Sequence, residues 1–431
     1  MLDVRQIRQD PDGFRAALAR RGNAEKTDAA IGRIMALDTE RRALIGEGDE
    51  LKSRRNAASQ QVAERKRAKE SADDLIAEVR QVGDRIREID ARLREVEGEL
   101  DDLLLRLPQP VDPSVPEGGE ESNTVVRCWG EPKELGFEAK PHWEIAQALG
   151  MLDLAGGAKV AGSGFPAYRG MGARLQRALI NFFLDLHTEK HGYTEVEPPF
   201  IVTRASMQGT GQYPKFVEDG DAYELPEDGM YLIPTSEVPL VNLYRDELLD
   251  AADLPIALTA YSPCFRREAG AAGKDTRGLL RLHQFDKVEM VRFERPEESW
   301  DALERITGHA EEALQLLGLP YRVLLLAAGD TGFGSAKTYD LEVWAPGVGK
   351  WLEVSSASNC VDFQGRRASI RYRPAPGEKP EFVHTLNASG LALPRTVVAL
   401  LETYQQADGS VTVPEALRPY LGTDRIVQTG A

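Results

Sequence analysis

The most regular hydrophobic pattern in the chain lies between residues 75 and 103. Apolar residues recur there at alternating steps of four and three, at Leu75, Val79, Val82, Ile86, Ile89, Leu93, Val96, Leu100 and Leu103. This spacing is that of a coiled-coil seam. Upstream, every seventh residue is apolar at Leu37, Leu44, Leu51 and Ala58. The pattern therefore predicts two long helices in an antiparallel hairpin, joined by a turn near residues 66–74.

The distal half of this predicted hairpin is basic. Its cations are Lys52, Arg54, Arg55, Arg65, Lys66, Arg67 and Lys69. Two interpretations are open at this point. The cations can form the solvated face of a coiled coil, or they can belong to a projecting arm that contacts the phosphates of a nucleic acid.

The pattern changes after the hairpin. Residues 107–123, LPQPVDPSVPEGGEESN, are rich in proline, glycine and acid, which is typical of a linker. Beyond them, alternation predicts strands at 193–202, 231–241, 257–268, 283–293, 321–327, 339–346 and 350–358. Helical spacing predicts helices at 172–191, 299–318 and 393–406. We expect an α+β fold, with an antiparallel sheet flanked by helices, and divide the chain into a helical arm (1–107), a linker (108–130) and a sheet domain (131–431).

Composition narrows the class of protein. With 53 Lys and Arg against 69 Asp and Glu, the formal net charge is −16, so any contact with nucleic acid must be local. The N-terminal residues MLDVRQIRQD show no signal-peptide pattern, and no run of about 18 apolar residues predicts a membrane span. The cysteines Cys128, Cys264 and Cys360 lack CxxC spacing. We therefore expect no disulfide framework, and a cytoplasmic location.

One segment concentrates cations against this acidic background. Residues 264–290, CFRREAGAAGKDTRGLLRLHQFDKVEM, carry Arg266, Arg267, Lys274, Arg277 and Arg281. We expect two strands joined by a glycine-rich loop, in which alternation places Arg266 and Glu268 on one face and Arg267 on the other. On the returning strand one face carries Phe285, Lys287 and Glu289. Such a surface suits a phosphate, an ammonium group and a flat base, and a salt-bridged sheet surface is the alternative.

Two further segments can converge on this surface. LEVSSASN, residues 352–359, places Glu353 at a strand end before a run of hydroxyl residues, which suits a divalent cation. Hydroxyls bonded to the backbone are the alternative there. HTLNASGLALPR, residues 384–395, predicts a strand, a small-residue turn and a helix carrying Arg395. This arginine can stack on a ring, pair with a phosphate, or lie on the surface.

Several familiar motifs are missing from the sequence. It contains neither a GxxxxGK[ST] loop nor a GxGxxG fingerprint, so a nucleotide would be held by arginine side chains and a sheet. The six histidines show no HExxH spacing, and His309 is more readily explained as structural. Nothing in the sequence favours a Ser-His-Asp triad.

Taken together, these segments resemble the seryl-tRNA synthetases, a family of class II aminoacyl-tRNA synthetases. The hairpin resembles the tRNA-binding arm of that family. HGYTEVEPPFIV (191–202) resembles the first class II motif, which usually lies at the dimer interface. The second motif matches residues 264–290, and the third matches TLNASGLALPR (385–395). The segments IPTSEVPL, GDTGFG and KTYDLEVW also match the family.

The resemblance implies a role for each matching residue. Serine would be held by Thr235, Ser236, Glu237, Arg266, Glu289, Asn387 and Ser389. ATP would be held by Arg266, Arg267, Glu268, Phe285, Glu353, Val354, Ser355, Ser356 and Arg395, with Arg267 contributing only its backbone. Arg266, Glu268 and Arg395 would serve the reaction itself, and Glu353 and Ser356 would hold Mg²⁺ on the phosphates. The basic hairpin would bind tRNA(Ser), and tRNA(Sec) where it is present, and the chain would form a homodimer.

The sequence departs from the family pattern at five positions. Arg267 replaces a common serine, Ala388 a frequent glycine, and Pro394 precedes the motif arginine, while Ala357 and Cys360 also differ from common forms. None of these changes removes a catalytic group, and a specialised second copy of the enzyme stays open.

Two rival functions remain. An adenylating homologue that loads a carrier protein is disfavoured by the basic hairpin. A coiled-coil scaffold with an inactive synthetase domain is disfavoured by the intact site residues.

Overall fold

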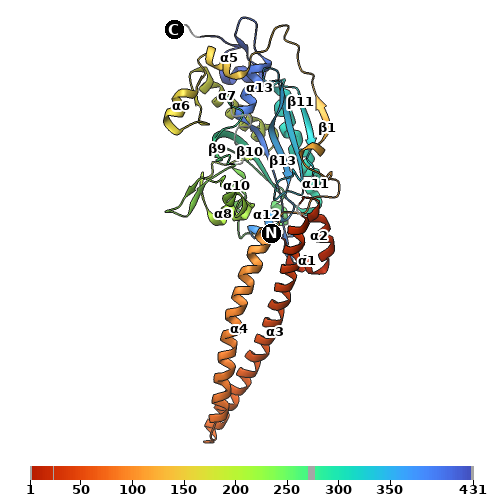
Figure 1. Cartoon of the computed structure of the whole chain (residues 1–431), viewed down its shortest axis with the longest axis vertical. Coiled ribbons are helices and arrows are strands. Elements are labelled where there is room, and N and C mark those ends of the chain that lie inside the picture. The colour runs from red at the N-terminus through yellow and green to blue at the C-terminus, as the bar shows by residue number, and fades with distance from the viewer. Residues whose placement is uncertain (1, 23, 270–276, 429–431) are drawn as a thin grey trace. The chain divides into compact units, whose positions relative to one another are not determined.

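The computed structural model describes residues 2–22, 24–269 and 277–428 (Figure 1). Lys274 and most of the predicted glycine-rich loop lie outside the described residues. The chain divides into two compact units. The first comprises Met1–Ala19 and Asn23–Pro108, and the second comprises Arg20–Gly22 and Gln109–Ala431.

The first unit is helical and contains the predicted hairpin. Its helices are α1 (Val4–Gln9), α2 (Pro11–Ala19), α3 (Ala24–Arg67) and α4 (Asp73–Leu105). The turn between α3 and α4 falls inside the predicted interval, and the α4 seam is buried at Leu75, Val82, Ile86, Ile89, Val96 and Leu100. At the end of the seam Leu104 is buried and Leu103 is only half-buried. Leu2, Ile7 and Leu18 of the N-terminal segment join the proximal part of this core.

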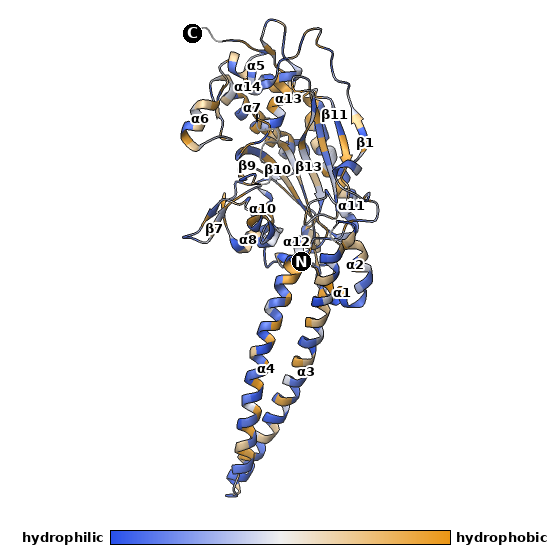
Figure 2. Cartoon of the chain, in the orientation of Figure 1, coloured by the Kyte–Doolittle hydropathy of each residue, from blue (hydrophilic) through white to orange (hydrophobic). Residues whose placement is uncertain are grey.

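A ladder of ion pairs, spaced seven residues apart on each helix, joins α3 and α4. Each arginine donates through Nε to Oε1 of a glutamate, at 2.6 Å in Arg33–Glu99, 2.7 Å in Glu40–Arg92, 2.9 Å in Glu47–Arg85 and 2.7 Å in Arg54–Glu78. The pairs are exposed, so each contributes little to stability. Because opposite charges meet only in this alignment, the ladder favours one register. Figure 2 shows both helices as mainly hydrophilic, with apolar residues recurring along them.

The second unit is built on an eight-stranded sheet. Its strands, in spatial order, are β1 (Thr124–Trp129), β11 (Tyr321–Leu325), β12 (Lys337–Ala345), β13 (Lys350–Asn359), β16 (His384–Ala392), β10 (Gln284–Glu294), β9 (Ile256–Phe265) and β4 (Thr194–Glu195). All neighbouring strands are antiparallel except β4 and β9, which are parallel. The predicted α+β class is confirmed.

Three long helices flank this sheet, as predicted. They are α7 (Met171–Asp185), which continues into a π-helical turn (Leu186–Lys190), α11 (Ser299–Leu316) and α13 (Leu393–Thr403). Helix α11 packs against β13 and β16, and α13 packs against β10 and β12. Their apolar faces bury Leu179, Phe183, Ile306, Leu314 and Val398 in one core with the sheet.

Shorter elements complete the described parts of the chain. The helices are α5 (His142–Ala148), α6 (Leu154–Ala161), α8 (Arg204–Thr210), α9 (Lys215–Glu218), α10 (Glu237–Asn242), α12 (Phe363–Arg367) and α14 (Arg418–Leu421). The strands are β2 (Leu152–Asp153), β3 (Ala167–Tyr168), β5 (Ile201–Thr203), β6 (Glu224–Leu225), β7 (Met230–Leu232), β8 (Leu248–Asp250), β14 (Arg371–Arg373), β15 (Glu381–Phe382), β17 (Val411–Thr412) and β18 (Arg425–Ile426). None of the described helices combines the length and the apolar composition needed to cross a membrane.

Three of the predicted elements differ from the structure in type or continuity. Residues 231–241 form β7 followed by helix α10, because a short apolar run such as VPLV fits a buried helix as well as a strand. Residues 193–202 are interrupted between β4 and β5 by two prolines, which cannot donate to a strand ladder. The predicted small-residue turn at LNASG is instead part of β16, which continues to Ala392.

The segment predicted as a linker, residues 108–130, is mostly ordered within the second unit. Val111 and Val115 are buried against Ala328, and the backbone N–H of Gln109 donates to the carbonyl of Phe333 at 2.9 Å. Its last residues form β1, which pairs with β11. The proline-rich composition predicted chain flexibility but gave no sign of these long-range partners.

Candidate active site

The cation-rich segment joins the end of β9 to the start of β10. The last ladder pair is Phe265 with Gln284, so the predicted strand to residue 268 is three residues too long. One further backbone bond, from Arg266 N–H to the carbonyl of His283 at 3.0 Å, extends the alternation past the strand end. The side chains of Arg266 and Glu268 line a cavity, whereas the exposed Arg267 guanidinium lies 5.4 Å from the ring centre of Tyr223. The predicted separation of the two arginines is therefore found.

Asp221 holds the backbone that carries Glu268. Its carbonyl accepts from the N–H of Arg267 at 2.8 Å, and its carboxylate accepts from the N–H of Ala269 at 2.7 Å. Between them Glu268 has φ +52°, in the left-handed region that non-glycine residues seldom adopt. Arg281 donates from Nη1 to the Glu268 carboxylate at 2.5 Å. These contacts fix the carboxylate at the cavity wall.

The first cavity has a volume of about 120 Å³, and its wall includes Arg266, Phe285 and Arg395. The Arg266 guanidinium lies 5.2 Å from the ring centre of Phe285. Arg395, at the start of α13, donates from Nη1 to the carbonyl and the carboxylate of Glu353 at 2.9 and 3.2 Å. Glu268 and Val354 also line this cavity. An aromatic ring, three arginines (Arg281 is the third) and two carboxylates thus surround one space.

The second cavity is larger, at about 440 Å³, and its wall includes Thr235, Glu237, Glu289, Asn387 and Ser389. Four residues line both cavities, which therefore adjoin: Arg266, Lys287, Glu353 and Ser389. The wall also contains Cys360, one of the departures from the family pattern.

Glu237, the first residue of α10, is held in place by two amides. Its Oε1 accepts from Gln364 Nε2 at 2.6 Å and from Asn387 Nδ2 at 2.7 Å. Burial, together with the nearby Glu289 carboxylate, raises the pKa of Glu237 to about 7. This carboxyl is therefore poised to ionise near neutral pH, where a cationic ligand would favour its charged form.

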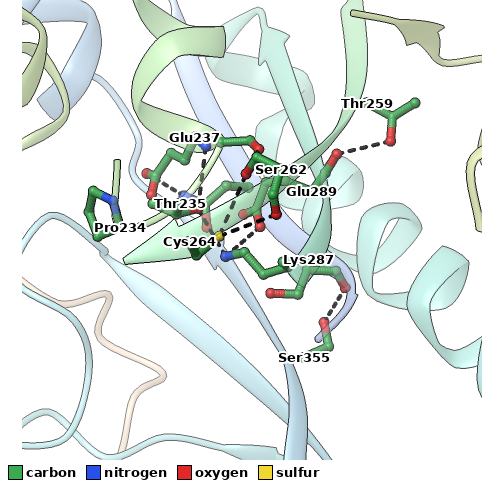
Figure 3. A network of polar contacts seen from close by, with 12 residues as sticks. Pro234, Thr235, Glu237, Thr259, Ser262, Cys264, Lys287, Glu289 and Ser355 are labelled. Atoms are coloured by element: carbon green, nitrogen blue, oxygen red, sulfur yellow. Dashed lines mark hydrogen bonds and ion pairs between the residues drawn. The ribbon is translucent and has the colours of Figure 1, made fainter. Parts of the chain in front are cut away.

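Glu289 and Lys287 form a buried ion pair beside Thr235 (Figure 3). Their side chains are 2% and 7% exposed, and Lys287 Nζ lies 2.5 Å from Glu289 Oε2. The same Nζ donates to Thr235 Oγ1 at 2.9 Å. Across the sheet Glu289 stands directly opposite Ser389. The predicted convergence of the LNASG segment on the surface that carries Glu289 is therefore found, and it occurs between two adjacent strands.

A bulge in β13 brings Glu353 and Ser356 to one wall. Glu342 pairs with Glu353 and Leu341 with Ser355, so Val354 is an extra residue in the ladder. In a regular strand, residues three apart would face opposite sides, but here both Glu353 and Ser356 line the second cavity. Glu353 lies inside β13, and the prediction that it ends a strand is wrong.

Two of the predicted serines face away from both cavities. Ser355 is buried and donates to the carbonyl of Ser389 at 2.6 Å. Ser236 is buried and donates to Ser262 Oγ at 2.5 Å. Both hydroxyls brace the walls that carry their neighbours, and only their backbones remain near the cavities.

The other departures from the family pattern are accommodated by the fold. Ala388 and Ala357 are buried and pair with each other across β16 and β13, so the added methyl group at 388 meets a small partner. Pro394 lies in the first turn of α13, where a proline is tolerated because that N–H has no helical acceptor.

Several contributors to the site were missed from the sequence. Asp221 and Gln364 support Glu268 and Glu237, but neither carries a local signal of that role. Arg281 was among the cations of the 264–290 segment, but its contact with Glu268 was not predicted. Lys287 was placed on the correct face by alternation, without its contacts to Thr235 and Glu289. Gln364 and Asp221 could be found only from contacts between segments far apart in the chain.

The basic residues of the hairpin fall into two groups. Lys52, Arg54 and Arg65 pair with Asp90, Glu78 and Asp74 of α4. Within the described residues, no ion pair engages Arg55, Lys66, Arg67 or Lys69. Lys66, Arg67 and Lys69 are exposed at the turn. The interpretation as a solvated coiled-coil face fits the first group, whereas Arg55 within α3 and Lys66, Arg67 and Lys69 at the tip carry charge that no ion pair balances within the described residues.

Comparisons with known proteins agree with this geometry. The family model for the seryl-tRNA synthetase N-terminal domain matches residues 1–111, and that for the class II tRNA synthetase core domain (G, H, P, S and T) matches residues 222–404. Curated proteins named serine–tRNA ligase are 57% identical in Gemmatimonas aurantiaca, over 98% of this chain and 99% of that one, and 57% identical in Geobacillus kaustophilus, over 99% and 100%.

Solved structures agree as well. Seryl-tRNA synthetase from Pyrococcus horikoshii, complexed with ATP, superposes with a TM-score of 0.93 at 40% identity over the whole of both chains. Cytoplasmic serine–tRNA ligase from Naegleria fowleri, in complex with AMP, gives 0.87 at 31% identity over 100% of this chain and 99% of that one. Arm, sheet, paired cavities and full-length similarity lead to one conclusion, that this chain belongs to the seryl-tRNA synthetase family.

Proposed function

We propose that the first cavity binds ATP, that the second binds L-serine, and that the reaction takes place where they adjoin. The chain is an aminoacyl-tRNA ligase that charges tRNA with serine. The serine carboxylate attacks the α-phosphate of ATP, pyrophosphate leaves, and the 3′-terminal hydroxyl of tRNA then takes the seryl group from AMP. The observation that carries this arrangement is the position of Arg266, which lines both cavities.

In the first cavity, charge and ring surface suit a nucleoside triphosphate. The adenine ring lies between Phe285 and Arg395, and Arg266 neutralises the α-phosphate as charge develops there. Glu268 contacts ATP, and the backbone of Arg267 lies alongside it. The remaining ATP contacts come from β13, at Glu353, Val354, Ser355 and Ser356. Since positioning and charge neutralisation suffice for this chemistry, no side-chain nucleophile is required.

In the second cavity, the polar groups suit a small amino acid. Thr235 and Glu237 take the ammonium group, with Asn387 holding the Glu237 carboxylate in place. Glu289 and Ser389 take the side-chain hydroxyl, and Arg266 takes the carboxylate that reacts. Ser236 contributes through its backbone, because its hydroxyl is directed to Ser262.

Mg²⁺ is proposed as the cofactor, held with ATP by Glu353 and Ser356. Carboxylate and hydroxyl oxygens are suitable ligands for this ion. Asp340 lies beside them with a buried Oδ1 that has no hydrogen-bond partner, and burial together with the Glu353 charge raises its carboxyl pKa. Carboxyl groups crowded in this way fit a divalent cation. When bound, Mg²⁺ would neutralise phosphate charge.

The remaining partners follow from the arm and from the class II motifs. The basic residues Lys52, Arg54, Arg55, Arg65, Lys66, Arg67 and Lys69 are proposed to contact the phosphates of tRNA(Ser), and of tRNA(Sec) where a cell has it. Homodimer formation is proposed from the first motif, residues 191–202. The three cysteines are unpaired, which supports a reducing cytoplasm as the location.

Two assays test this function. Serine-dependent exchange of pyrophosphate into ATP separates an enzyme from an inactive scaffold. Charging of purified tRNA(Ser) separates a tRNA ligase from a homologue that loads another acceptor. Exchange without charging would favour that homologue, and the absence of both activities would favour the scaffold.

A further inference from the structure

Lys287 is the buried cation of the second cavity, and the roles proposed above leave it without a task. It lies on β10, paired with Ser262 of β9 and Ala392 of β16. Its side chain is only 7% exposed. Burying an ammonium group is unfavourable unless its partners compensate, so the contacts of Nζ indicate what holds it there.

The ammonium of Lys287 engages both ends of the proposed serine site. Nζ donates to Thr235 Oγ1 at 2.9 Å and lies 2.5 Å from Glu289 Oε2 (Figure 3). Thr235 is the proposed acceptor for the substrate ammonium, and Glu289 for the substrate hydroxyl. One side chain therefore occupies the partners of two substrate groups.

The hydroxyl of Thr235 has no acceptor capacity left. A hydroxyl oxygen has two lone pairs. One accepts from Lys287 Nζ, and the other accepts from the backbone N–H of Glu237 at 3.3 Å. An incoming ammonium group can bond this oxygen only if a present donor leaves. The backbone donor is fixed in the first turn of α10, whereas the lysine side chain can rotate.

The carboxylate of Glu289 contacts the Lys287 ammonium, but the geometry between them is poor for a hydrogen bond. Glu289 Oε2 is buried and has no hydrogen bond of acceptable geometry, even though Nζ lies 2.5 Å away. A buried acceptor in this condition gains from a better-placed donor. The hydroxyl of serine is such a donor.

The side chain of Lys287 can also reach the first cavity. It lines the first cavity as well as the second, together with Arg266 and Glu353. Its long unbranched stem can turn Nζ toward the space proposed for the phosphates without any change in the strand. There its charge would meet phosphate oxygens in place of Thr235.

We propose that the Lys287 ammonium occupies the substrate-ammonium position of the serine cavity in the free protein and moves toward the ATP cavity when serine binds. This inference rests on the proposed assignment of the two cavities. Serine brings an ammonium group in place of the one that leaves, and its carboxylate is balanced by Arg266, so the ammonium position of the serine cavity stays filled while the ATP cavity gains a cation. Each substrate therefore strengthens the binding of the other, because coupling between two sites is reciprocal.

A binding experiment measures this coupling. The probe is an ATP analogue with CH₂ in place of the α,β-bridging oxygen, so that pyrophosphate cannot leave. It is titrated calorimetrically into the full chain with and without saturating L-serine. In the unaltered protein, serine should tighten the analogue by about fivefold or more, and in Lys287→Met serine should leave its affinity unchanged.

A matched control removes a lysine from the wall of the same cavity. Lys215 lines the second cavity but pairs with Asp219, the residue that directly follows its own short helix α9. Lys215→Met changes the charge by the same amount and should retain the coupling. If Lys287→Met does not fold, Lys287→Gln replaces it, since glutamine is neutral and of similar length.

A pH profile distinguishes loss of the Lys287 charge beside Glu237 from simple structural damage. The charged groups that face Glu237 are Glu289 and Lys287 from β10 and Arg266 from the end of β9. Its other polar neighbours are Cys360, Gln364 and Asn387. Its pKa is raised to about 7 by burial and by Glu289, and Lys287 acts to lower it. Because ionised Glu237 attracts the serine ammonium, kcat/KM for serine should rise with pH through about 7, and this limb reports the free enzyme.

Loss of Lys287 should move this limb to higher pH, because a cation that favours the Glu237 carboxylate has gone. Structural damage alone would lower kcat/KM at every pH without moving the limb. The proposal is overturned if the unaltered protein shows no coupling, if Lys287→Met retains it, or if the limb stays in place. Failure of the unaltered protein to bind serine and the analogue would instead reject the proposed function.

Discussion

The second cavity and the helical hairpin both contain ion pairs, within β10 in the cavity and between α3 and α4 in the hairpin, and these pairs lie in opposite surroundings. In the cavity, Lys287 and Glu289 are 7% and 2% exposed. In the hairpin ladder, Arg33 and Glu99 are 48% and 45% exposed, and the other three pairs are similarly open to water. The Lys287–Glu289 pair is nearly excluded from water, whereas the pairs of the ladder are screened by solvent.

This difference decides how each region responds to a change. Removing one member of a buried pair leaves an uncompensated charge in a low dielectric, so a single residue has a large effect. Removing one member of an exposed pair has little effect, because water and salt take its place. The hairpin should therefore act through its length and the number of its tip charges, and the cavity through individual groups.

The largest effect is expected from shortening the hairpin while keeping its tip. Deleting residues 44–57 and 75–88 removes two heptads from each helix, so the ladder register is preserved. The tip should retreat by about 20 Å. Charging of tRNA should fall by about a thousandfold or more as phosphate contacts are lost, while serine-dependent pyrophosphate exchange should be unchanged.

The matched control for this deletion keeps the arm length. It replaces Leu44 and Leu51 with isoleucine, which leaves the hairpin and all its charges in place and should charge normally. The deletion keeps Ile31, Ile34 and Leu37, which pack against the N-terminal helices, so the first unit retains that part of its core. Normal charging by the shortened protein would break the comparison, since neither the reach of the tip nor the deleted cations Lys52, Arg54 and Arg55 would then be needed.

The next largest effect contrasts two adjacent arginines in the catalytic unit. Arg266→Ala should lower the exchange rate by about a hundredfold to a thousandfold, the usual loss when a preorganised charge at a reacting centre is removed. Arg267→Ser should stay within about twofold, because the exposed guanidinium of Arg267 contacts Tyr223 outside the cavities. Each variant loses one positive charge, so equal losses in kcat/KM for ATP would reject the difference in surroundings.

A third effect concerns the choice of amino acid. A site that bonds a substrate hydroxyl rejects the analogue without it by about 10⁴-fold, whereas a small apolar difference gives about 10-fold to 200-fold. Glu289→Ala should therefore lose serine activity and most of the preference for serine over alanine, measured by pyrophosphate exchange. Glu289→Gln keeps the size and one oxygen acceptor, and should retain more of that preference.

Threonine sharpens this test, because it carries the hydroxyl that Glu289 is proposed to read. Its extra methyl group can be rejected only by steric limits, so it should be the more troublesome competitor for the unaltered protein. If Glu289→Ala kept its full preference over alanine, the role of Glu289 in recognising the hydroxyl would be wrong.

Local patterns predicted the parts of the fold that depend on neighbours in sequence. The heptad spacing gave the seam of α4, because burial in a coiled coil follows that period directly. Alternation gave the cavity face of Phe285, Lys287 and Glu289, because β10 is regular against β9. The individual roles of the site residues came from family resemblance, and they stay proposals.

Parts that depend on distant segments were not predictable in this way. The bulge that aligns Glu353 with Ser356 exists only against β12, and the sequence of β13 alone does not reveal it. The amide of Gln364 reaches Glu237 from a helix 127 residues away in the chain. The apolar run after Glu237 became a helix rather than a strand because short apolar runs fit either structure.

The smallest effect is expected from single charges on the hairpin, and it divides them into two groups. Lys66, Arg67 and Lys69 have no ion-pair partner within the described residues, whereas Lys52 pairs with Asp90. Replacing a tip cation with alanine should weaken charging a fewfold and lower the salt slope of tRNA binding by about one. Lys52→Ala should change the slope less, because its charge is already partly balanced. Binding of tRNA(Ser) measured from 50 to 200 mM salt separates the two outcomes, and equal slopes for both groups would show that the Lys52–Asp90 pair opens when tRNA binds.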